Sequence, residues 1–134
     1  MNSLIVRYPQ DAAVNKVQLP YSPCVVVGGL VFVSGQASVD ADGNIVSEET
    51  FEPEFRRSLQ NLQTVLRSAG CELRDVVQTR NYVRDEADLP LYNQLYREYF
   101  VDPRPSRTTI TNCLPSTIRY EIECVAVLPS AREN

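Results

Sequence analysis

Histidine is absent from this 134-residue chain. Imidazole is the side chain whose ordinary pKa lies closest to neutral pH, and it is the commonest metal ligand. Its absence excludes imidazole general-base catalysis and the Ser-His and Cys-His nucleophile pairs. Any reaction carried out by this chain must therefore proceed without imidazole.

Clustered cysteines are also lacking. No two of the four cysteines stand in a Cys-x-x-Cys spacing, as a zinc site would favour; they are Cys24, Cys71, Cys113 and Cys124. Three of them lie in apolar, strand-like contexts, where a free thiol packs as a small hydrophobic group. We therefore expect no metal site and no disulfide framework, and a reduced, cytoplasmic protein.

The chain has neither an excess of basic residues nor a long hydrophobic run. Its net charge is -4, and its arginines are scattered among acids. This pattern does not favour a nucleic-acid-binding protein, which usually carries a basic stripe. The N-terminus lacks the apolar core of a signal peptide. The longest apolar run, Cys24 to Val33, is too short to span a bilayer, so no membrane partner is expected.

What is present indicates one domain, residues 1–134, with 43% hydrophobic and 22% charged residues. Paired glycines at 28 and 29 divide the apolar run at 24–33 into two predicted strands. Because neither arm alternates with polar residues, both faces of each should be buried. A short strand is also expected within residues 4–6.

Two segments have helical periodicity. Apolar residues from about Phe51 to Ala69 fall on one stripe, and Gly70 is a natural terminator of that helix. Residues 76–83 predict a strand. A second helix is predicted at about 89–100, with Asp88 as its N-cap and Pro90 in its first turn.

Residues 105–128 predict two neighbouring strands joined by a short turn, at about 107–113 and 119–128. Side chains alternate along a strand, so Arg107 and Thr109 share a face, and so do Glu121 and Glu123. The later strand becomes apolar on both sides, where carboxylates need a partner or a use. Two interpretations stay open: a cross-strand charge pair with Arg107 on a solvated face, or a functional site.

The expected order is β-β-β-α-β-α-β-β, an α+β arrangement of one sheet and two helices. The strands are apolar enough to be covered on both faces, but two helices cover only one. The other face should therefore meet a second copy of the chain. A homo-oligomer is expected.

A series of segments, in this order, resembles the RidA/YjgF family of reactive-intermediate deaminases. They are Pro20-Tyr21-Ser22, the 31–36 segment, the Gly70 helix end, the 82–85 segment, Tyr92-Asn93 ahead of Tyr99-Phe100, the 105–108 segment and the 120–127 segment. The resemblance covers about residues 19–128. It implies a chorismate-mutase-like fold, with one mixed sheet, two helices packed on one face, and homotrimers whose sites lie between subunits.

The resemblance also implies an activity: hydrolysis of 2-imino or enamine acids, such as 2-aminoacrylate, to 2-keto acids and ammonia, without a cofactor. By position, Arg107 resembles the arginine that grips the substrate carboxylate, and Glu121 the acid that positions water or moves protons. The resemblance assigns substrate-binding positions to further residues, namely Tyr21, Ser34, Gly35 and Asn93.

Two departures from the family pattern affect the pocket wall. Thr109 stands where many members have cysteine, and the interval from Arg107 to Glu121 is one residue shorter than in the commonest members. Thr109 should contact whatever Arg107 contacts, and Glu123 could take the role of Glu121 because both point the same way. These changes bear on substrate identity more than on the reaction class.

Other interpretations remain. Tyr21 could be a core aromatic, Asn93 a surface helix residue and Ser34 a strand end. The chain could be a pathway-specific deaminase acting on 2-aminomuconate, or a trimer that binds a carboxylate metabolite without turnover. It could also be an RNA-directed endoribonuclease or translation inhibitor, although the acidic balance and the missing histidine argue against that.

Overall fold

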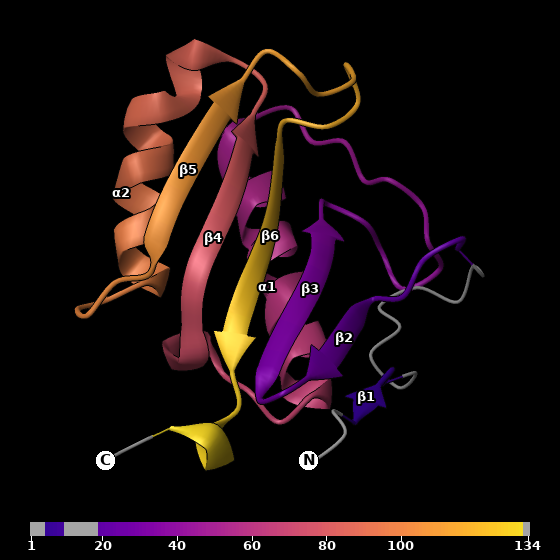
Figure 1. Ribbon diagram of the computed structural model, residues 1–134. Coiled ribbons are helices and arrows are strands. Elements are labelled where there is room, and N and C mark those ends of the chain that lie inside the picture. Colours follow the sequence, from indigo (N-terminus) through magenta and orange to yellow (C-terminus); the bar gives the residue numbers. More distant parts are fainter. Residues whose placement is uncertain (1–4, 10–18, 133–134) are drawn as a thin grey trace.

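A computed structural model describes residues 5–9 and 19–132 (Figure 1). Its strands form one six-stranded sheet in the order β1-β2-β3-β6-β4-β5. The strands are β1 Val6–Arg7, β2 Cys24–Val27, β3 Leu30–Gln36, β4 Val76–Val83, β5 Ser106–Thr111 and β6 Tyr120–Val127. The helices are α1 Phe51–Ser68 and α2 Leu89–Tyr99, and both lie on the same side of the sheet. The predicted element order and the mixed sheet are confirmed. A short strand was expected within residues 4–6. Residue 4 lies outside the described part of the chain, and the observed strand β1 includes Val6 and Arg7.

The hairpin of β2 and β3 turns at Gly28 and Gly29, whose φ angles are 57° and 83°. This left-handed backbone favours glycine. The expectation that both faces of the hairpin are buried is wrong for the single chain. Val31 and Val33 are buried under the helices, but Leu30 and Phe32 are 38% and 43% exposed. The helices cover only one face, so alternate side chains of the apolar arm remain accessible.

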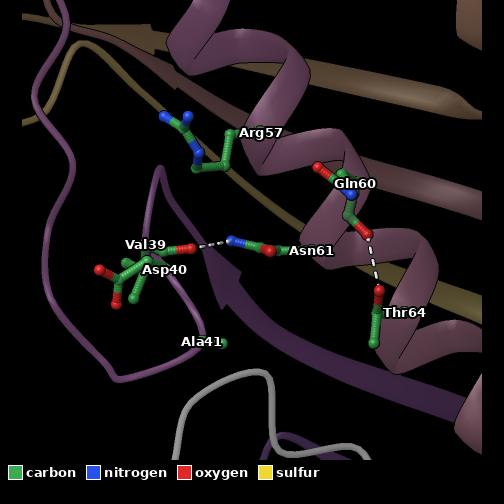
Figure 2. A pocket seen from close by; sticks show the side chains of 7 residues that line it. All are labelled: Val39, Asp40, Ala41, Arg57, Gln60, Asn61 and Thr64. Atoms are coloured by element: carbon green, nitrogen blue, oxygen red, sulfur yellow. Dashed lines mark hydrogen bonds between the residues drawn. The ribbon is translucent and has the colours of Figure 1, made fainter.

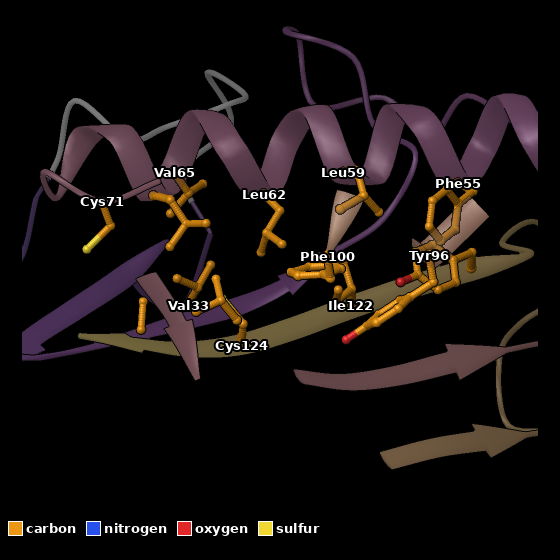
Figure 3. Close-up of a cluster of buried hydrophobic side chains, with 14 of the residues drawn as sticks. Val33, Phe55, Leu59, Leu62, Val65, Cys71, Tyr96, Phe100, Ile122 and Cys124 are labelled. Carbon is orange, nitrogen blue, oxygen red and sulfur yellow. The ribbon is translucent and has the colours of Figure 1, made fainter. Parts of the chain in front are cut away.

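Helix α1 packs its predicted apolar stripe onto the middle of the sheet. Phe55, Leu59, Leu62 and Val65 point down toward Val33, Ile122 and Cys124 of the strands, and all are buried (Figure 3). Gly70 ends the helix with a φ of 89°, and its N–H donates to the carbonyl of Arg67. This packing fixes the centre of the sheet, where β3 and β6 pair.

The last two strands are not neighbours, contrary to the prediction. β4 lies between them, pairing antiparallel with β6 and parallel with β5. A parallel pair needs a crossover connection, and α2 supplies it between β4 and β5. Asp88 occupies the N-cap position of α2 as expected, but its side chain makes no capping hydrogen bond. Since β5 pairs only with β4 and is last in the strand order, it is an edge strand.

The sheet has two unlike faces. We call the side covered by α1 and α2 the helix face, and the other side the open face. The open face carries a continuous apolar surface across three strands, made of Val25, Val27, Leu30, Phe32, Val125 and Val127. Leu30 pairs with Val127, and Phe32 with Val125. Each face carries some of the candidate site residues.

Candidate functional site

Arg107 lies on the helix face of the edge strand β5. It pairs with Thr79 of β4, which is buried under the helices. The guanidinium carbon of Arg107 lies 4.8 Å from the ring centroid of Tyr92 and 4.9 Å from that of Tyr96, both on α2. Within the described part of the chain, Arg107 forms no salt bridge and donates no side-chain hydrogen bond. An exposed guanidinium without a protein acceptor is available to an anionic ligand.

Thr109 lies two residues further on, on the same face, as expected. Its Oγ1 is 2.7 Å from the hydroxyl of Tyr92. Burial raises the pKa of Tyr92 to about 12, although Thr109 and Arg107 oppose the change. Burial likewise raises the pKa of Tyr96. Both tyrosines are therefore neutral near pH 7. We call Arg107, Thr109, Tyr92 and Tyr96 the arginine cluster.

A buried chain of hydrogen bonds supports this cluster from below. The hydroxyls of Tyr96 and Thr79 are 2.7 Å apart, and the side-chain amide of Asn81 donates to the Thr79 hydroxyl at 3.0 Å. The hydroxyl of Tyr120 donates to the side-chain amide oxygen Oδ1 of Asn81 at 2.5 Å. Each buried polar group thus has a partner, which removes the cost of burying it.

Asn93 follows Tyr92 on α2 and is half-buried. Its side chain makes no hydrogen bond within the described part of the chain. Asn93 is thus adjacent in sequence to one member of the arginine cluster, Tyr92. Its role in substrate binding remains a prediction.

Glu121 lies on the opposite side of the sheet. It pairs with Tyr82 on the open face of β6, near the end of β3. A Cβ atom at Gly35 would lie 3.0 Å from the carboxyl carbon of Glu121. Such a contact is shorter than a side chain tolerates without displacing the carboxyl group. A glycine at position 35 therefore leaves room for the Glu121 carboxylate.

Ser34 fixes the segment that carries Tyr21. Its hydroxyl donates to the carbonyl of Ser22 at 2.7 Å, and its backbone N–H donates to the carbonyl of Pro23 at 2.9 Å. Tyr21 is 55% exposed, so it is not a core aromatic. We call Tyr21, Ser34, Gly35 and Glu121 the carboxyl cluster.

The electrostatics of Glu121 differ from those of Glu123. Burial raises the pKa of Glu121, and the nearby charge of Glu123 raises it further. Glu123 accepts a hydrogen bond from the hydroxyl of Tyr82. Glu123 does share the open face, as predicted, but its carboxylate has a partner, whereas Glu121 has no side-chain hydrogen bond within the described residues.

The interpretation of Arg107 and the two glutamates as a cross-strand pair is wrong. Arg107 lies on the helix face, the glutamates lie on the open face, and β4 separates their strands. A single chain therefore does not bring Arg107 and Glu121 together. One chain presents the two clusters at different surfaces.

A hollow of about 330 Å³ lies elsewhere, between α1 and the loop after β3 (Figure 2). It is lined by Val39, Asp40, Ala41, Arg57, Gln60, Asn61 and Thr64, none of which the sequence predicts as a site residue. Arg57 already pairs with Glu48 at 3.1 Å, and the Asn61 amide donates to the carbonyl of Val39 at 3.0 Å. These groups are engaged in holding the loop on the helix.

No group of three or more potential ligands among His, Cys, Asp and Glu gathers in residues 5–9 and 19–132. Within the same residues, no helix has the length and apolarity needed to cross a membrane.

Tyr92 and Tyr96 were not among the site residues predicted from the sequence. A signal was available: two tyrosines four residues apart present their rings on one helix face, and both carry polar hydroxyls. The buried polar residues Asn81 and Tyr120 were also missed, because single polar residues in a strand pattern do not reveal whether they are buried.

Comparisons with known proteins place these observations in context. The family model described as Endoribonuclease L-PSP matches residues 12–128. Human 2-iminobutanoate/2-iminopropanoate deaminase is 35% identical over 129 residues, covering 95% of this chain and 93% of its own. The mitochondrial protein mmf2 of Schizosaccharomyces pombe is 40% identical over 111 residues, covering 80% and 86%.

Among solved structures, a Yersinia pestis protein of unknown function in the conserved Rid protein family matches with a TM-score of 0.83. It is 27% identical in sequence, and the match covers 92% of this chain and 100% of that one.

Proposed function

Since the chain belongs to the RidA/YjgF family, we propose that it hydrolyses small 2-imino acids and their enamine tautomers, such as 2-aminoacrylate. The products are 2-keto acids and ammonia. The observation that carries the proposal is Arg107, an exposed guanidinium that rests on two rings and has no anionic partner within the described residues. The human relative is named as a deaminase of 2-iminobutanoate and 2-iminopropanoate, which are substrates of this class.

The reaction needs three operations. The carboxylate of the substrate is held by two parallel hydrogen bonds from Arg107. Water adds to C2 of the protonated C=N bond, the π electrons move to nitrogen, and the water loses a proton. The amine then takes a proton, the C–N bond breaks with its electrons going to nitrogen, and ammonia leaves. The hydroxyl group on C2 loses its proton as the C=O bond of the ketone forms. Binding the imine beside an ordered water makes the addition effectively intramolecular.

Glu121 serves as the group that orients water and moves protons, because a carboxyl group can do both without histidine. The raised pKa of Glu121 lies closer to neutral pH than that of an ordinary glutamate, which favours both uptake and release of a proton. We assign Ser34, Gly35 and Tyr21 to the rest of that side of the pocket. Thr109 shares a strand face with Arg107, and Asn93 is a further proposed substrate contact. Glu123 is held by Tyr82 and serves as a charge beside Glu121.

We further propose a homotrimer in which the arginine cluster of one copy meets the carboxyl cluster of the next. The separation of the two clusters on one chain supports this arrangement, as does the apolar surface on the open face. A second copy placed on that face would cover Leu30 and Phe32. The fold is the chorismate-mutase-like arrangement that the family resemblance implies.

Cytoplasmic location stays a prediction, since one relative is named as a mitochondrial protein. The preferred side chain of the substrate also stays open between a broad deaminase and a pathway-specific one, such as a 2-aminomuconate deaminase.

The decisive assay couples an amino-acid oxidase, which generates 2-imino acids, to semicarbazide, which traps them. A deaminase lowers semicarbazone formation and releases ammonia. A trimer that only binds carboxylates leaves semicarbazone formation unchanged, and that result would refute the proposal. Arg107→Ala is the matched control.

The description of the matching family model favours a second candidate, cleavage of RNA. A net charge of -4 and the absence of histidine weigh against it. RNA cleavage, or RNA binding that weakens steeply with added salt, would support this candidate over imine hydrolysis.

A further inference from the structure

We propose that Tyr92 and Tyr96 are positioning residues for Arg107: their rings form a platform that holds the guanidinium in the orientation that binds the substrate carboxylate. This inference rests on the proposed function and deepens it. Neither tyrosine needs to touch the substrate, because both would act through Arg107.

The geometry of the platform comes from one helix and one strand. The two tyrosines stand four residues apart on α2, so their rings lie on one side of the helix. The guanidinium carbon lies at nearly equal distances, 4.8 Å and 4.9 Å, from the two ring centroids. Both distances are within the range of cation–π attraction. The side chain is thus attracted to two neutral rings at once.

The rings themselves are fixed. The hydroxyl of Tyr92 is bonded to Thr109, and that of Tyr96 to Thr79, each at 2.7 Å. Tyr96 also stacks on Phe100 with centroids 4.5 Å apart, and both tyrosines are buried. The hydrogen bonds at the hydroxyl groups and the packing of the rings therefore restrict rotation of both tyrosine side chains away from Arg107.

Rings suit this task better than a carboxylate would. An acidic partner would occupy the N–H donors of Arg107 and cancel its charge, whereas a ring leaves those donors available. Both phenols are neutral near pH 7, because the ordinary pKa of tyrosine is about 10 and burial raises the pKa of each further. Arg107 stands on an exposed edge strand, so an unsupported side chain would lose much rotamer freedom on binding. The platform removes part of that loss in advance.

The kinetic consequence is specific. Arg107 holds the carboxylate in the ground state and the transition state alike, so weakening its support raises KM and leaves kcat nearly unchanged. The effect must also depend on the negative charge of the ligand. A substitution that merely loosened the fold would not discriminate between a charged and a neutral ligand.

The experiment compares Tyr92→Leu and Tyr96→Leu with Tyr92→Phe, which keeps the ring and loses the hydroxyl. The matched control is Tyr99→Leu on the same helix, because the ring of Tyr99 lies under another arginine, Arg56, at 5.8 Å. The readouts are KM and kcat for imine hydrolysis, and inhibition by 2-oxobutanoate and by its neutral amide. Leucine variants that fail to fold are replaced by methionine, which fills space without a ring face.

Both leucine variants should raise KM and the Ki of 2-oxobutanoate by about 3- to 30-fold, with kcat within about twofold and unchanged inhibition by the amide. Tyr92→Phe should retain most of the affinity, and Tyr99→Leu should retain all of it. Wild-type KM in both folded leucine variants would overturn the inference, as would equal losses for acid and amide. If the wild-type protein turns over no imine, the proposed function fails separately. Calorimetric binding of 2-oxobutanoate then tests the platform, and binding that is absent or insensitive to the leucine substitutions overturns it.

Discussion

Arg107 and Glu121 project from opposite faces of the same sheet, with strand β4 between the strands that carry them. Two residues that we propose for one reaction would thus be brought together only by two copies of the chain. This relationship can be tested by mixing two impaired variants. Arg107→Ala and Glu121→Gln proteins should each lose most of their activity.

Unfolding and refolding the two variants together should restore activity. With random assembly of equal amounts, about a quarter of the sites would combine an intact Arg107 with an intact Glu121. Activity is measured after mixing and compared with each variant refolded alone. If both residues acted within one chain, no mixture would recover activity.

Removing the guanidinium alone should be severe. Arg107→Ala deletes two charge-assisted hydrogen bonds, each worth about 1.5–3 kcal/mol. We expect kcat/KM for imine hydrolysis to fall by about two to four decades. Arg97→Ala, at an exposed position of α2, is the control and should keep full activity. Near-wild-type hydrolysis by a folded Arg107→Ala protein would disprove the site assignment.

The pH dependence should follow Glu121. Its pKa is raised above 4.5, first by burial and second by the charge of Glu123. If the ionised carboxylate directs water, kcat/KM rises as pH increases through that pKa. Glu123→Gln removes the second cause, so the rising limb should move to lower pH. An unmoved limb in Glu123→Gln would show that Glu121 is not the titrating group.

The raised pKa of Glu121 also determines how the stability of the fold changes with pH. Because the folded chain holds the Glu121 proton to a higher pH than the unfolded chain does, the free energy of unfolding decreases as pH rises from 4.5 through the folded pKa. Glu121→Gln should remove this decrease. Thermal unfolding of both proteins across this pH range measures the effect.

The stability of the fold should depend strongly on the buried ion pair of Glu54 and Arg119. Glu54 is fully buried and accepts hydrogen bonds from the Arg119 guanidinium at 2.7 Å and from the backbone N–H of Arg119 at 2.9 Å. Arg119→Met leaves that carboxylate without its cation and should cost about 3–5 kcal/mol. The exposed pair of Glu52 and Arg56 is the control, and Glu52→Gln should cost less than about 1 kcal/mol. Urea unfolding distinguishes the two, and equal costs would contradict this account.

The apolar open face predicts association. Phe32→Glu places a charge in the middle of the exposed apolar surface, where a second copy would bury it at high cost. We expect sedimentation equilibrium to show a trimer for the wild type and monomers for Phe32→Glu, with activity lost. A wild-type monomer at micromolar concentration would refute the assembly.

Periodicity in the sequence was enough to predict the elements, because it reports on local burial. The stripe of α1 and the bounds of β4 are confirmed, and Gly70 ends its helix as expected. Alternation also showed that Arg107 shares a face with Thr109. It could not show which strand lies next to which, since the face of a strand says nothing about its neighbour. The sequence therefore left open a cross-strand pair of Arg107 with the glutamates, which the structure excludes because β4 lies between β5 and β6.

The tyrosine platform was beyond the same reasoning for a related reason. Tyrosine at helical spacing predicts a buried face, whether or not an arginine from a distant strand lies on it. The contact joins α2 to β5 and depends on the parallel crossover, which periodicity does not encode.

The crossover unit β4–α2–β5 has a consequence for how such a protein can diversify. Arg107, its two supporting rings and Thr109 all belong to one unbroken stretch, residues 76–111. Grafting that stretch from one relative into another would exchange the arginine cluster, which we propose binds the carboxylate, and would leave the carboxyl cluster unchanged. Chimeras with junctions before β4 and after β5 would show whether residues 76–111 select the substrate.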